Sequence, residues 1–382
     1  MYSKKIINIL TLLFIGLLAG CNGFFETDNA PSPAPLPRFK PEISPHAIWS
    51  AQIGSGTEEY LKKPIGSNSN AIFVTRQRGT VAKINKQTGR ICWQINTTFP
   101  ITTGVAVNED VVVFGTQKGE TVALSTLNGA MFWRAQGPGE ILATPVLAQN
   151  RVVVKYTNGY VRALSLEDGH ELWSYQQTEP ALILRGSSTP LVKNNNVIVG
   201  FANGNLAKLN ANLGDQLWSQ PVAIPQGAFA IERMVDINAD PVMYHDDLYA
   251  ATYQGKIAML NWLSGTPQWT RDISSYTGMV ADRDAVYISD AQSHLWSFNA
   301  QTGATHWQQG KLLARGITAP AALRNYLIVG DHEGYIHWLS KDDGRFVART
   351  TLGGPIYTAP LVDENEIVYV WTAQGQLTAY KS

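Results

Sequence analysis

The chain has 382 residues, and its 30 Lys and Arg residues balance its 30 Asp and Glu residues. A net charge of zero supplies no global field that would attract nucleic acid or an anionic membrane surface. The chain contains only two cysteines, which excludes a disulfide-stapled scaffold.

The first 20 residues have the parts of a bacterial export signal. Two lysines near the start form a positive region, residues 6–18 are apolar, and small residues follow. This apolar stretch is too short to span a membrane comfortably, so residues 1–20 are predicted to be a signal peptide. The string Leu18-Ala19-Gly20-Cys21 resembles the bacterial lipobox, which implies cleavage before Cys21 and a lipid anchor on it. The residue after this cysteine is Asn22 rather than Asp. In this the chain resembles lipoproteins that are forwarded to the outer membrane. The alternative is an ordinary secretory peptide with an incidental cysteine.

A proline-rich segment follows the predicted lipidation site. Residues 22–46 contain six prolines and few large apolar side chains, so they cannot build a core. We therefore predict that residues 21–46 form a semi-extended tether. At about 3.1 Å per residue, some 25 residues of polyproline II would reach up to about 75 Å. The folded body is then expected to move freely near a membrane.

The rest of the chain repeats one pattern of strands and turns. Each repeat contains an apolar strand, a hairpin with a glycine, an alternating strand, a second turn that ends in glycine, and a strand with a tryptophan. The hairpin glycine recurs along the chain, and Ser293 takes its place once. The period is typical of a four-stranded propeller blade. The last-strand position is occupied by Trp49, Trp93, Trp133, Trp173, Trp218, Trp269, Trp307 and, once, Ala348.

These positions predict an all-β, eight-bladed propeller of four-stranded antiparallel blades over residues 47–382. Trp49 has no strands before it, and the last repeat ends before its tryptophan. The strand around Trp49 is therefore predicted to pair with the three C-terminal strands and to close the ring, which removes an open edge. We expect each tryptophan to pack between blades and to donate its N–H to a neighbouring carbonyl. Ala348 predicts a blade that is looser or packed differently.

Motifs for metal binding and catalysis are incomplete. His332-Glu333…His337 resembles a zinc motif, but its spacing is one residue too long and Gly334 marks a hairpin. Asp236-x-Asn238-x-Asp240 resembles the start of a calcium loop, but Pro241 stands where glycine is needed. Cys92 is predicted to be a small packed residue of a strand. We predict no enzymatic activity, no metal and no cofactor.

Two connections between repeats are longer than the others. From the tryptophan to the proline of the next repeat, regular repeats have 12 or 13 residues, whereas Trp173–Pro190 has 17 and Trp218–Pro241 has 23. Both insertions occupy the same kind of connection in neighbouring repeats, so we predict that they share one face. Alternatively, residues 182–184 begin the next inner strand. The insertions carry aliphatic and charged residues typical of interfaces, among them Leu182, Leu184, Arg185, Phe229, Ile231, Arg233, Met234 and Asp236.

The Thr-Gly…Trp repeat of the chain resembles that of the pyrroloquinoline-quinone (PQQ) type propellers. The quinoprotein dehydrogenases among them also have eight blades, and they carry an adjacent cysteine pair beside the cofactor. Cys92 is the only cysteine in the predicted propeller. A PQQ-dependent dehydrogenase is therefore one alternative, and a propeller that binds glycan or cell wall is another.

Three stretches resemble the BamB family of lipoproteins more closely: Leu182-x-Leu184-Arg185-Gly186, Glu232-Arg233…Asp236, and 330–348. The resemblance implies a non-enzymatic lipoprotein of the outer-membrane β-barrel assembly (BAM) complex, on the periplasmic face, that binds the POTRA domains of BamA. Unfolded outer-membrane precursors are a further expected partner, held at exposed strand edges. The family's contact residues correspond here to Leu182, Leu184, Arg185 and Asp236, and its second acidic position is Asn238.

Overall fold

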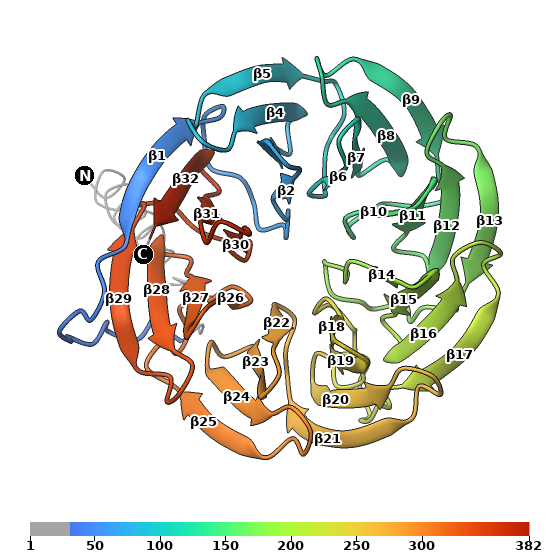
Figure 1. Cartoon of the computed structure of the whole chain (residues 1–382). Helices are drawn as coiled ribbons and strands as arrows, with labels where there is room; N and C mark the ends of the chain where they lie inside the picture. The colour runs from blue at the N-terminus through green and yellow to red at the C-terminus, as the bar shows by residue number, and fades with distance from the viewer. Residues whose placement is uncertain (1–30, 382) are drawn as a thin grey trace, which may run out of the picture. The chain divides into compact units, whose positions relative to one another are not determined.

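The computed structural model describes residues 31–381, and residues 34–381 belong to one compact unit. The predicted signal peptide and Cys21 lie outside the described residues. The unit consists of eight four-stranded antiparallel sheets arranged around a ring (Figure 1). The predicted eight-bladed propeller is confirmed. Among the described residues, no helix has the length and apolarity needed to cross a membrane.

Each blade is numbered by its place along the chain, and its strands are given from the inside of the ring outwards. Blade 1 contains β2 (Gly66–Ser67), β3 (Ala71–Thr75), β4 (Thr80–Asn85) and β5 (Ile91–Asn96), and blade 2 contains β6 (Ala106–Val107), β7 (Val111–Gly115), β8 (Glu120–Ser125) and β9 (Met131–Gln136). Blade 3 contains β10 (Val146–Ala148), β11 (Arg151–Lys155), β12 (Tyr160–Ser165) and β13 (Glu171–Gln176), and blade 4 contains β14 (Leu191–Lys193), β15 (Asn196–Gly200), β16 (Asn205–Asn210) and β17 (Gln216–Pro221). Blade 5 contains β18 (Val242–Tyr244), β19 (Asp247–Ala251), β20 (Gly255–Asn261) and β21 (Pro267–Ile273), and blade 6 contains β22 (Gly278–Ala281), β23 (Ala285–Ser289), β24 (Leu295–Asn299) and β25 (Thr305–Gln309). Blade 7 contains β26 (Ala321–Leu323), β27 (Tyr326–Gly330), β28 (Tyr335–Ser340) and β29 (Phe346–Thr351), and blade 8 contains β30 (Leu361–Val362), β31 (Val368–Trp371), β32 (Gln376–Lys381) and β1 (His46–Gln52).

The ring closes through the two ends of the folded unit. Strand β1 pairs antiparallel with β32, and Trp49 lies opposite Ala379 in the register. The N-terminal strand thus supplies the outer strand of blade 8, as the repeat count predicts. The pairing gives β32 a partner on both edges, so the ring has no unpaired strand at its closure.

The repeated tryptophans join each blade to the next one. The indole N–H of every one of the seven donates to a backbone carbonyl of the following blade, at 2.8 to 3.3 Å. The indole ring of each tryptophan packs on the second turn of that following blade. A Cβ added to Gly169, for example, would lie 2.5 Å from the indole of Trp133. The turn glycine therefore provides both a positive φ and room for the neighbouring tryptophan.

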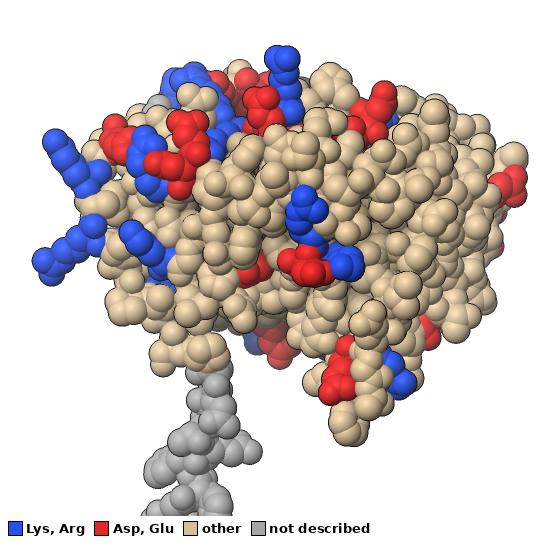
Figure 2. Space-filling view, turned by 90° about the horizontal axis from the view of Figure 1, so that it is seen from below, with Lys and Arg blue, Asp and Glu red and all other residues tan. Residues whose placement is uncertain are grey.

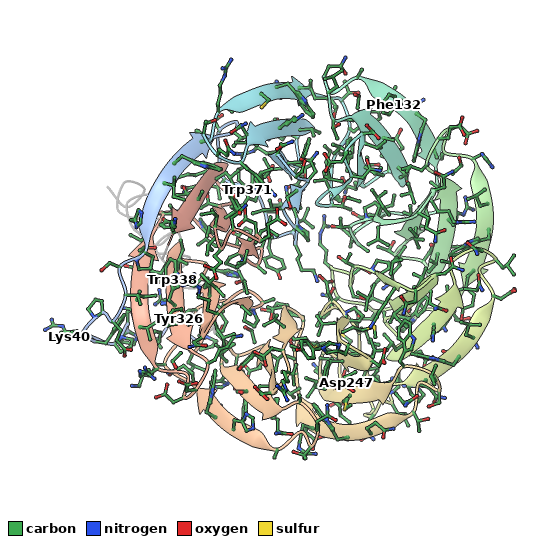
Figure 3. All side chains as sticks on the ribbon, viewed as in Figure 1. Lys40, Phe132, Asp247, Tyr326, Trp338 and Trp371 are labelled. Carbon is green, nitrogen blue, oxygen red and sulfur yellow. The ribbon has the colours of Figure 1, made fainter. Side chains whose placement is uncertain are left out.

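Ala348 stands where blade 7 would carry its tryptophan, and the ring closure explains the exception. The third and fourth strands of blade 8 are β32 and β1, the two ends of the unit, so no turn links them. A tryptophan at position 348 would have no turn glycine to cover. The interface is filled from another strand: Trp338 of β28 is fully buried inside blade 7 (Figure 3), and its ring lies edge-on to Tyr380, 5.8 Å between centroids.

The N-terminal segment Ala34–Ile43 packs against blade 7. The backbone N–H of Glu42 donates to the carbonyl of Val347 at the outer edge of β29. The Glu42 carboxylate pairs with Arg345 at 2.8 Å, and Phe39 stacks on Phe346. Lys40 marks this segment outside β29 in Figure 3. The prediction of a free tether up to His46 is therefore wrong in its C-terminal half, because these residues have apolar and charged partners on blade 7.

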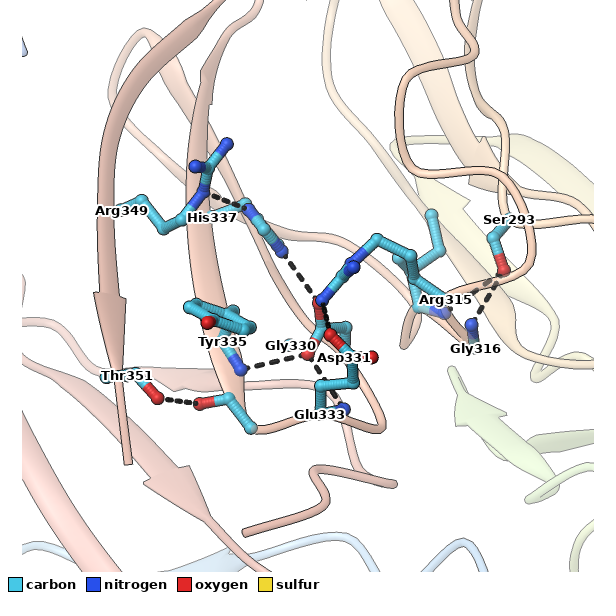
Figure 4. A network of polar contacts seen from close by, with 12 residues as sticks. Ser293, Arg315, Gly316, Gly330, Asp331, Glu333, Tyr335, His337, Arg349 and Thr351 are labelled. Atoms are coloured by element: carbon cyan, nitrogen blue, oxygen red, sulfur yellow. Dashed lines mark hydrogen bonds and ion pairs between the residues drawn. The ribbon is translucent and has the colours of Figure 1, made fainter. Parts of the chain in front are cut away.

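A buried polar network joins blade 7 to the connection before it (Figure 4), and Arg315 of that connection contacts the N-terminal segment. Arg315 donates to the Asp331 carboxylate at 2.7 Å and to the carbonyl of Ala34 at 3.0 Å. The Asp331 carboxylate also contacts Nε2 of His337 at 3.0 Å, and Nδ1 of that ring accepts from Nε of Arg349. Since Arg349 occupies Nδ1, His337 must be neutral with its proton on Nε2. The zinc motif predicted to be incomplete is part of this network, and the described residues contain no metal-binding group of three or more ligands.

We expect acid to destabilise blade 7 through His337. Burial lowers the pKa of His337, so below its unfolded value of 6.5 the unfolded state binds more protons and stability falls as the pH decreases. Burial also lowers the pKa of His332, which acts in the same direction. Thermal melts between pH 7.5 and 5 should show a steeper loss for the native protein than for His337→Gln. That variant keeps one donor and one acceptor but does not titrate, so an equal pH dependence of the two would contradict the assignment.

The expectation for Cys92 is also wrong. Cys92 is a free, exposed thiol. It lies in β5, where side chains alternate between the two faces, and the next residue, Trp93, points into the blade interface. The period of two therefore turns Cys92 towards solvent.

Candidate partner-binding face

The two insertions form one continuous surface. The first insertion, residues 177–190, connects β13 to β14, and the second insertion, residues 222–241, connects β17 to β18. Both leave the end of a fourth strand, so they emerge on the same face of the ring, which we call the binding face. Residues 182–184 precede β14, which begins at Leu191. The alternative that they form an inner strand is therefore wrong.

Hydrogen bonds join the two insertions. The backbone N–H of Leu184 donates to Oδ1 of Asp236 at 2.8 Å, and that of Thr189 donates to Oδ1 of Asp240 at 2.7 Å. The amide of Asn238 packs against the backbone of Gly186, where an added Cβ would lie 2.5 Å from Nδ2. The first insertion thus rests on the base of the second, although the residues that meet are about fifty positions apart.

The five predicted contact residues separate into two groups. Leu182 is 44% exposed, Arg185 is exposed and Leu184 is half-buried, so these three present a surface. Asp236 is only 4% exposed and Asn238 is likewise buried. The resemblance implied direct contacts for Leu182, Leu184, Arg185 and Asp236, with Asn238 at the family's second acidic position. The geometry places the two polar residues beneath the loop, where they support its shape.

The second insertion adds an apolar projection. A turn at its centre is closed by hydrogen bonds from the N–H groups of Glu232 and Arg233 to the carbonyls of Phe229 and Ala230. The Glu232 carboxylate accepts from the backbone N–H groups of residues 228 and 229. Phe229 and Ile231 are 69% and 61% exposed. Large exposed apolar side chains on a stiffened turn are typical of interaction surfaces. The third hydrophobic residue predicted here, Met234, is buried.

A third connection reaches the same surface and was missed in the sequence. Residues 53–65 join β1 to β2 across the ring closure. From this connection, Nζ of Lys62 donates to the carbonyl of Asn238 at 2.9 Å and to the Asp240 carboxylate at 2.7 Å. These residues also account for the calcium-like motif, since the Asp236 and Asp240 carboxylates bind protein donors. The 176 residues that separate Lys62 from Asn238 leave no local pattern from which the contact is predictable.

A cavity of about 270 Å³ opens beside the Lys62–Asp240 pair. It is lined by Tyr60, Tyr276 and Tyr357 together with apolar residues. Burial raises the pKa of Tyr60, so its hydroxyl stays protonated and uncharged. The side view of the ring shows positive and negative side chains intermixed rather than a field of one sign (Figure 2). The surface is suited to apolar and hydrogen-bonding contacts with a polypeptide.

The comparison with known proteins agrees with this architecture. The family described as outer membrane protein assembly factor BamB matches residues 77–309 and 297–382. The chain belongs to the BamB family. It is 31% identical over 374 residues to the outer membrane protein assembly factor BamB of Yersinia pestis, and the match covers 94% of this chain and 95% of that protein.

Solved structures separate the family from its distant fold relatives. The crystal structure of BamB from Moraxella catarrhalis matches with a TM-score of 0.80 and 27% identity, over 87% of this chain and 100% of that one. The quinohemoprotein alcohol dehydrogenase of Comamonas testosteroni matches with a TM-score of 0.71 but only 12% identity, over 88% of this chain and 76% of that one. The second likeness concerns the propeller fold alone.

Proposed function

We propose that this chain is a non-enzymatic scaffold lipoprotein of the outer-membrane β-barrel assembly complex that binds the POTRA domains of BamA through its binding face. The observation that supports this most directly is the bond between the Leu184 amide and Asp236. It fixes the first insertion on the second and leaves Leu182 and Arg185 at the surface. Membership of the BamB family supports the assignment to outer-membrane protein assembly.

The composition of the binding face suits a protein partner. An exposed arginine beside aliphatic side chains, with an aromatic residue on a neighbouring turn, has the make-up of an interface hot spot. Arg185 supplies the cation, Leu182 the aliphatic surface and Phe229 the aromatic ring. Because the hydrogen bonds between the insertions preform this arrangement, little conformational entropy remains to be lost on binding.

The proposed anchor places the ring at the periplasmic face of the outer membrane. Lipid on Cys21 would hold the chain in the membrane. Since the Ala34 N–H already donates to the carbonyl of Leu313, in the connection before blade 7, the proposed tether is limited to the residues between Cys21 and Ala34. The twelve residues 22–33, at about 3.1 Å each, would span at most about 40 Å. The ring would therefore stay close to the membrane rather than explore about 75 Å.

Contact with unfolded outer-membrane precursors is a second proposed role of the same scaffold. Strands β9, β13 and β17 are the outer strands of their blades, each with one edge outside its sheet. An extended polypeptide pairs readily with such an edge. Site-directed photo-crosslinking from these strands during barrel assembly would test it, and crosslinks found on the binding face alone would contradict it.

Reversing the charge of Arg185 is expected to weaken binding to purified BamA POTRA domains. For Arg185→Glu and Leu184→Glu we expect a loss of about 2 kcal/mol or more, which is roughly thirtyfold in Kd. Titration calorimetry with the mature protein measures this. The matched control is Leu127→Glu, an exposed leucine in the turn before β9, at the opposite end of the fourth strand from the binding face.

Three outcomes distinguish the possibilities. Loss of affinity in the two insertion variants but not in Leu127→Glu supports the proposed site. Native affinity in both insertion variants would exclude it. Capture of glycan instead of POTRA domains, or oxidation of an alcohol with added quinone and calcium, would favour one of the alternative functions.

A further inference from the structure

A small cavity of about 10 Å³ lies beneath the first insertion, and charged groups from three separate segments line it. Lys155 stands at the end of β11, in the framework of blade 3, and is 4% exposed. Glu179 comes from the first insertion and Asp236 from the second. Ile183 and Gly186 of the first insertion also line the cavity. One lysine of the rigid scaffold therefore shares a cavity with a carboxylate from each insertion.

Both carboxylates already hold backbone groups in place. Oδ1 of Asp236 accepts from the Leu184 amide at 2.8 Å, and Oε2 of Glu179 accepts from the Ala202 amide at 2.9 Å. The second oxygen of Asp236, Oδ2, is buried and has no hydrogen-bond partner among the described residues. A buried carboxylate with one bare oxygen is costly unless a positive charge stands nearby.

We propose that Lys155 is the positioning residue of the binding face: its ammonium neutralises Glu179 and Asp236 and thereby holds the two insertions in the arrangement that binds the partner. The inference rests on the proposed function of that face. Lys155 itself is buried and does not touch the partner. It acts through the Asp236 carboxylate, which in turn holds the amide of Leu184.

The electrostatics of the cluster agree with this role. Burial lowers the pKa of Lys155 to about 8, against the opposing effect of Glu179 and Asp236. Lys62 lowers the same pKa and Asp240 raises it, which completes the charged groups that face Lys155. Burial raises the pKa of both Glu179 and Asp236. Each group of the cluster thus pays a desolvation penalty that its oppositely charged neighbours partly offset.

Three variants test the proposal with the full mature protein. Lys155→Met removes the charge and keeps most of the volume, and Lys155→Arg keeps the charge. Lys208→Met is the matched control: Lys208 is also a buried lysine of a framework strand, but it donates to the carbonyl of Trp262 between blades 4 and 5. Lys155→Met is expected to weaken POTRA binding at least about tenfold, whereas Lys208→Met should affect thermal stability but not binding.

The pH dependence gives a second readout that a purely structural role would not move. As the pH rises from 7 to 9, Lys155 loses its proton through a pKa of about 8, so affinity of the native protein should fall. Lys155→Arg stays charged over this range, so its affinity should not fall between pH 7 and pH 9. Lys155→Met should be equally weak at both pH values. The same pH dependence of affinity in the native protein, Lys155→Arg and Lys155→Met would overturn the proposal.

Hydrogen exchange separates this inference from the proposed function, because it needs no partner. In Lys155→Met, the amides of residues 179–188 should exchange faster than in Lys208→Met, since the acceptor of the Leu184 amide loses its counter-charge. Unchanged exchange and unchanged binding would exclude Lys155 as the positioning residue. If exchange accelerates while Arg185→Glu still binds POTRA domains normally, the loop is positioned as inferred but the partner binds elsewhere.

Discussion

Replacing Trp133 by alanine is expected to lower the free energy of unfolding by about 3–5 kcal/mol. The indole is buried among the side chains of blades 2 and 3, and its N–H donates to the carbonyl of Leu166 at 2.8 Å. Gly169 lies directly against the ring. The substitution leaves a cavity between two blades and deprives the Leu166 carbonyl of its donor, so the transfer and cavity contributions add to the loss of a hydrogen bond.

The matched control for this prediction is the preceding residue of the same strand. Phe132 points outwards from β9 at the rim of the ring (Figure 3) and is 55% exposed. Phe132→Ala should change the unfolding free energy by only about 0.5 kcal/mol, as is usual for surface positions. Urea denaturation of both variants measures the difference. Equal midpoints for Trp133→Ala and Phe132→Ala would mean that the tryptophans do not join the blades.

Replacing Asp331 by alanine should cost about 3–5 kcal/mol of stability, because it removes the buried counter-ion of the Arg315 guanidinium, which keeps only the partly exposed carboxylate of Glu333. Asp331 is fully buried. Its carboxylate accepts from Arg315 at 2.7 Å and from the backbone N–H groups of Glu333 and Tyr335. Burial raises its pKa, but the bonds from His337, Tyr335 and Arg315 outweigh this and hold the pKa below its usual value. The charged form is therefore the one that the fold requires.

The loss of Asp331 should also release the N-terminal segment. Arg315 bridges Asp331 and the carbonyl of Ala34, so its displacement is expected to speed proteolysis between residues 34 and 43. Asp343→Ala is the control in the same blade. Its carboxylate pairs with Arg345 at the surface, where water screens the interaction, and the effect should be small. Denaturation and limited proteolysis that do not distinguish the two variants would contradict the role of the network.

Stability and partner binding are expected to depend on different parts of the molecule. The tryptophan and Asp331 substitutions test the scaffold, whereas substitutions in the insertions and at Lys155 test what the scaffold presents. A ring that unfolds at lower denaturant while retaining partner affinity under native conditions is the expected result for Trp133→Ala. Arg185→Glu is expected to unfold at the same denaturant concentration as the native protein but to lose affinity for the partner. This separation is possible because the insertions lie outside the blade sheets.

The number of blades, their closure and the position of the insertions were all predictable from the sequence. These features depend on local requirements that recur in every repeat. A turn with positive φ favours glycine, and the outer strand needs a large ring with a donor to cover that glycine. The four-residue spacing of Gly129 and Trp133 therefore identifies a blade in the sequence. The extra residues after Trp173 and Trp218 identify the two insertions.

Only the tertiary structure decided which side chains form the face and which support it. Asp236 is buried under Leu184, Lys62 reaches Asn238 from the other side of the ring closure, and Glu42 pairs with Arg345 across 303 residues. Long-range contacts of this kind leave no period in the sequence, because each involves a single residue that no repeat copies. Burial is likewise a property of the assembled ring, so a charged residue in an insertion can face the partner or hold the loop from beneath.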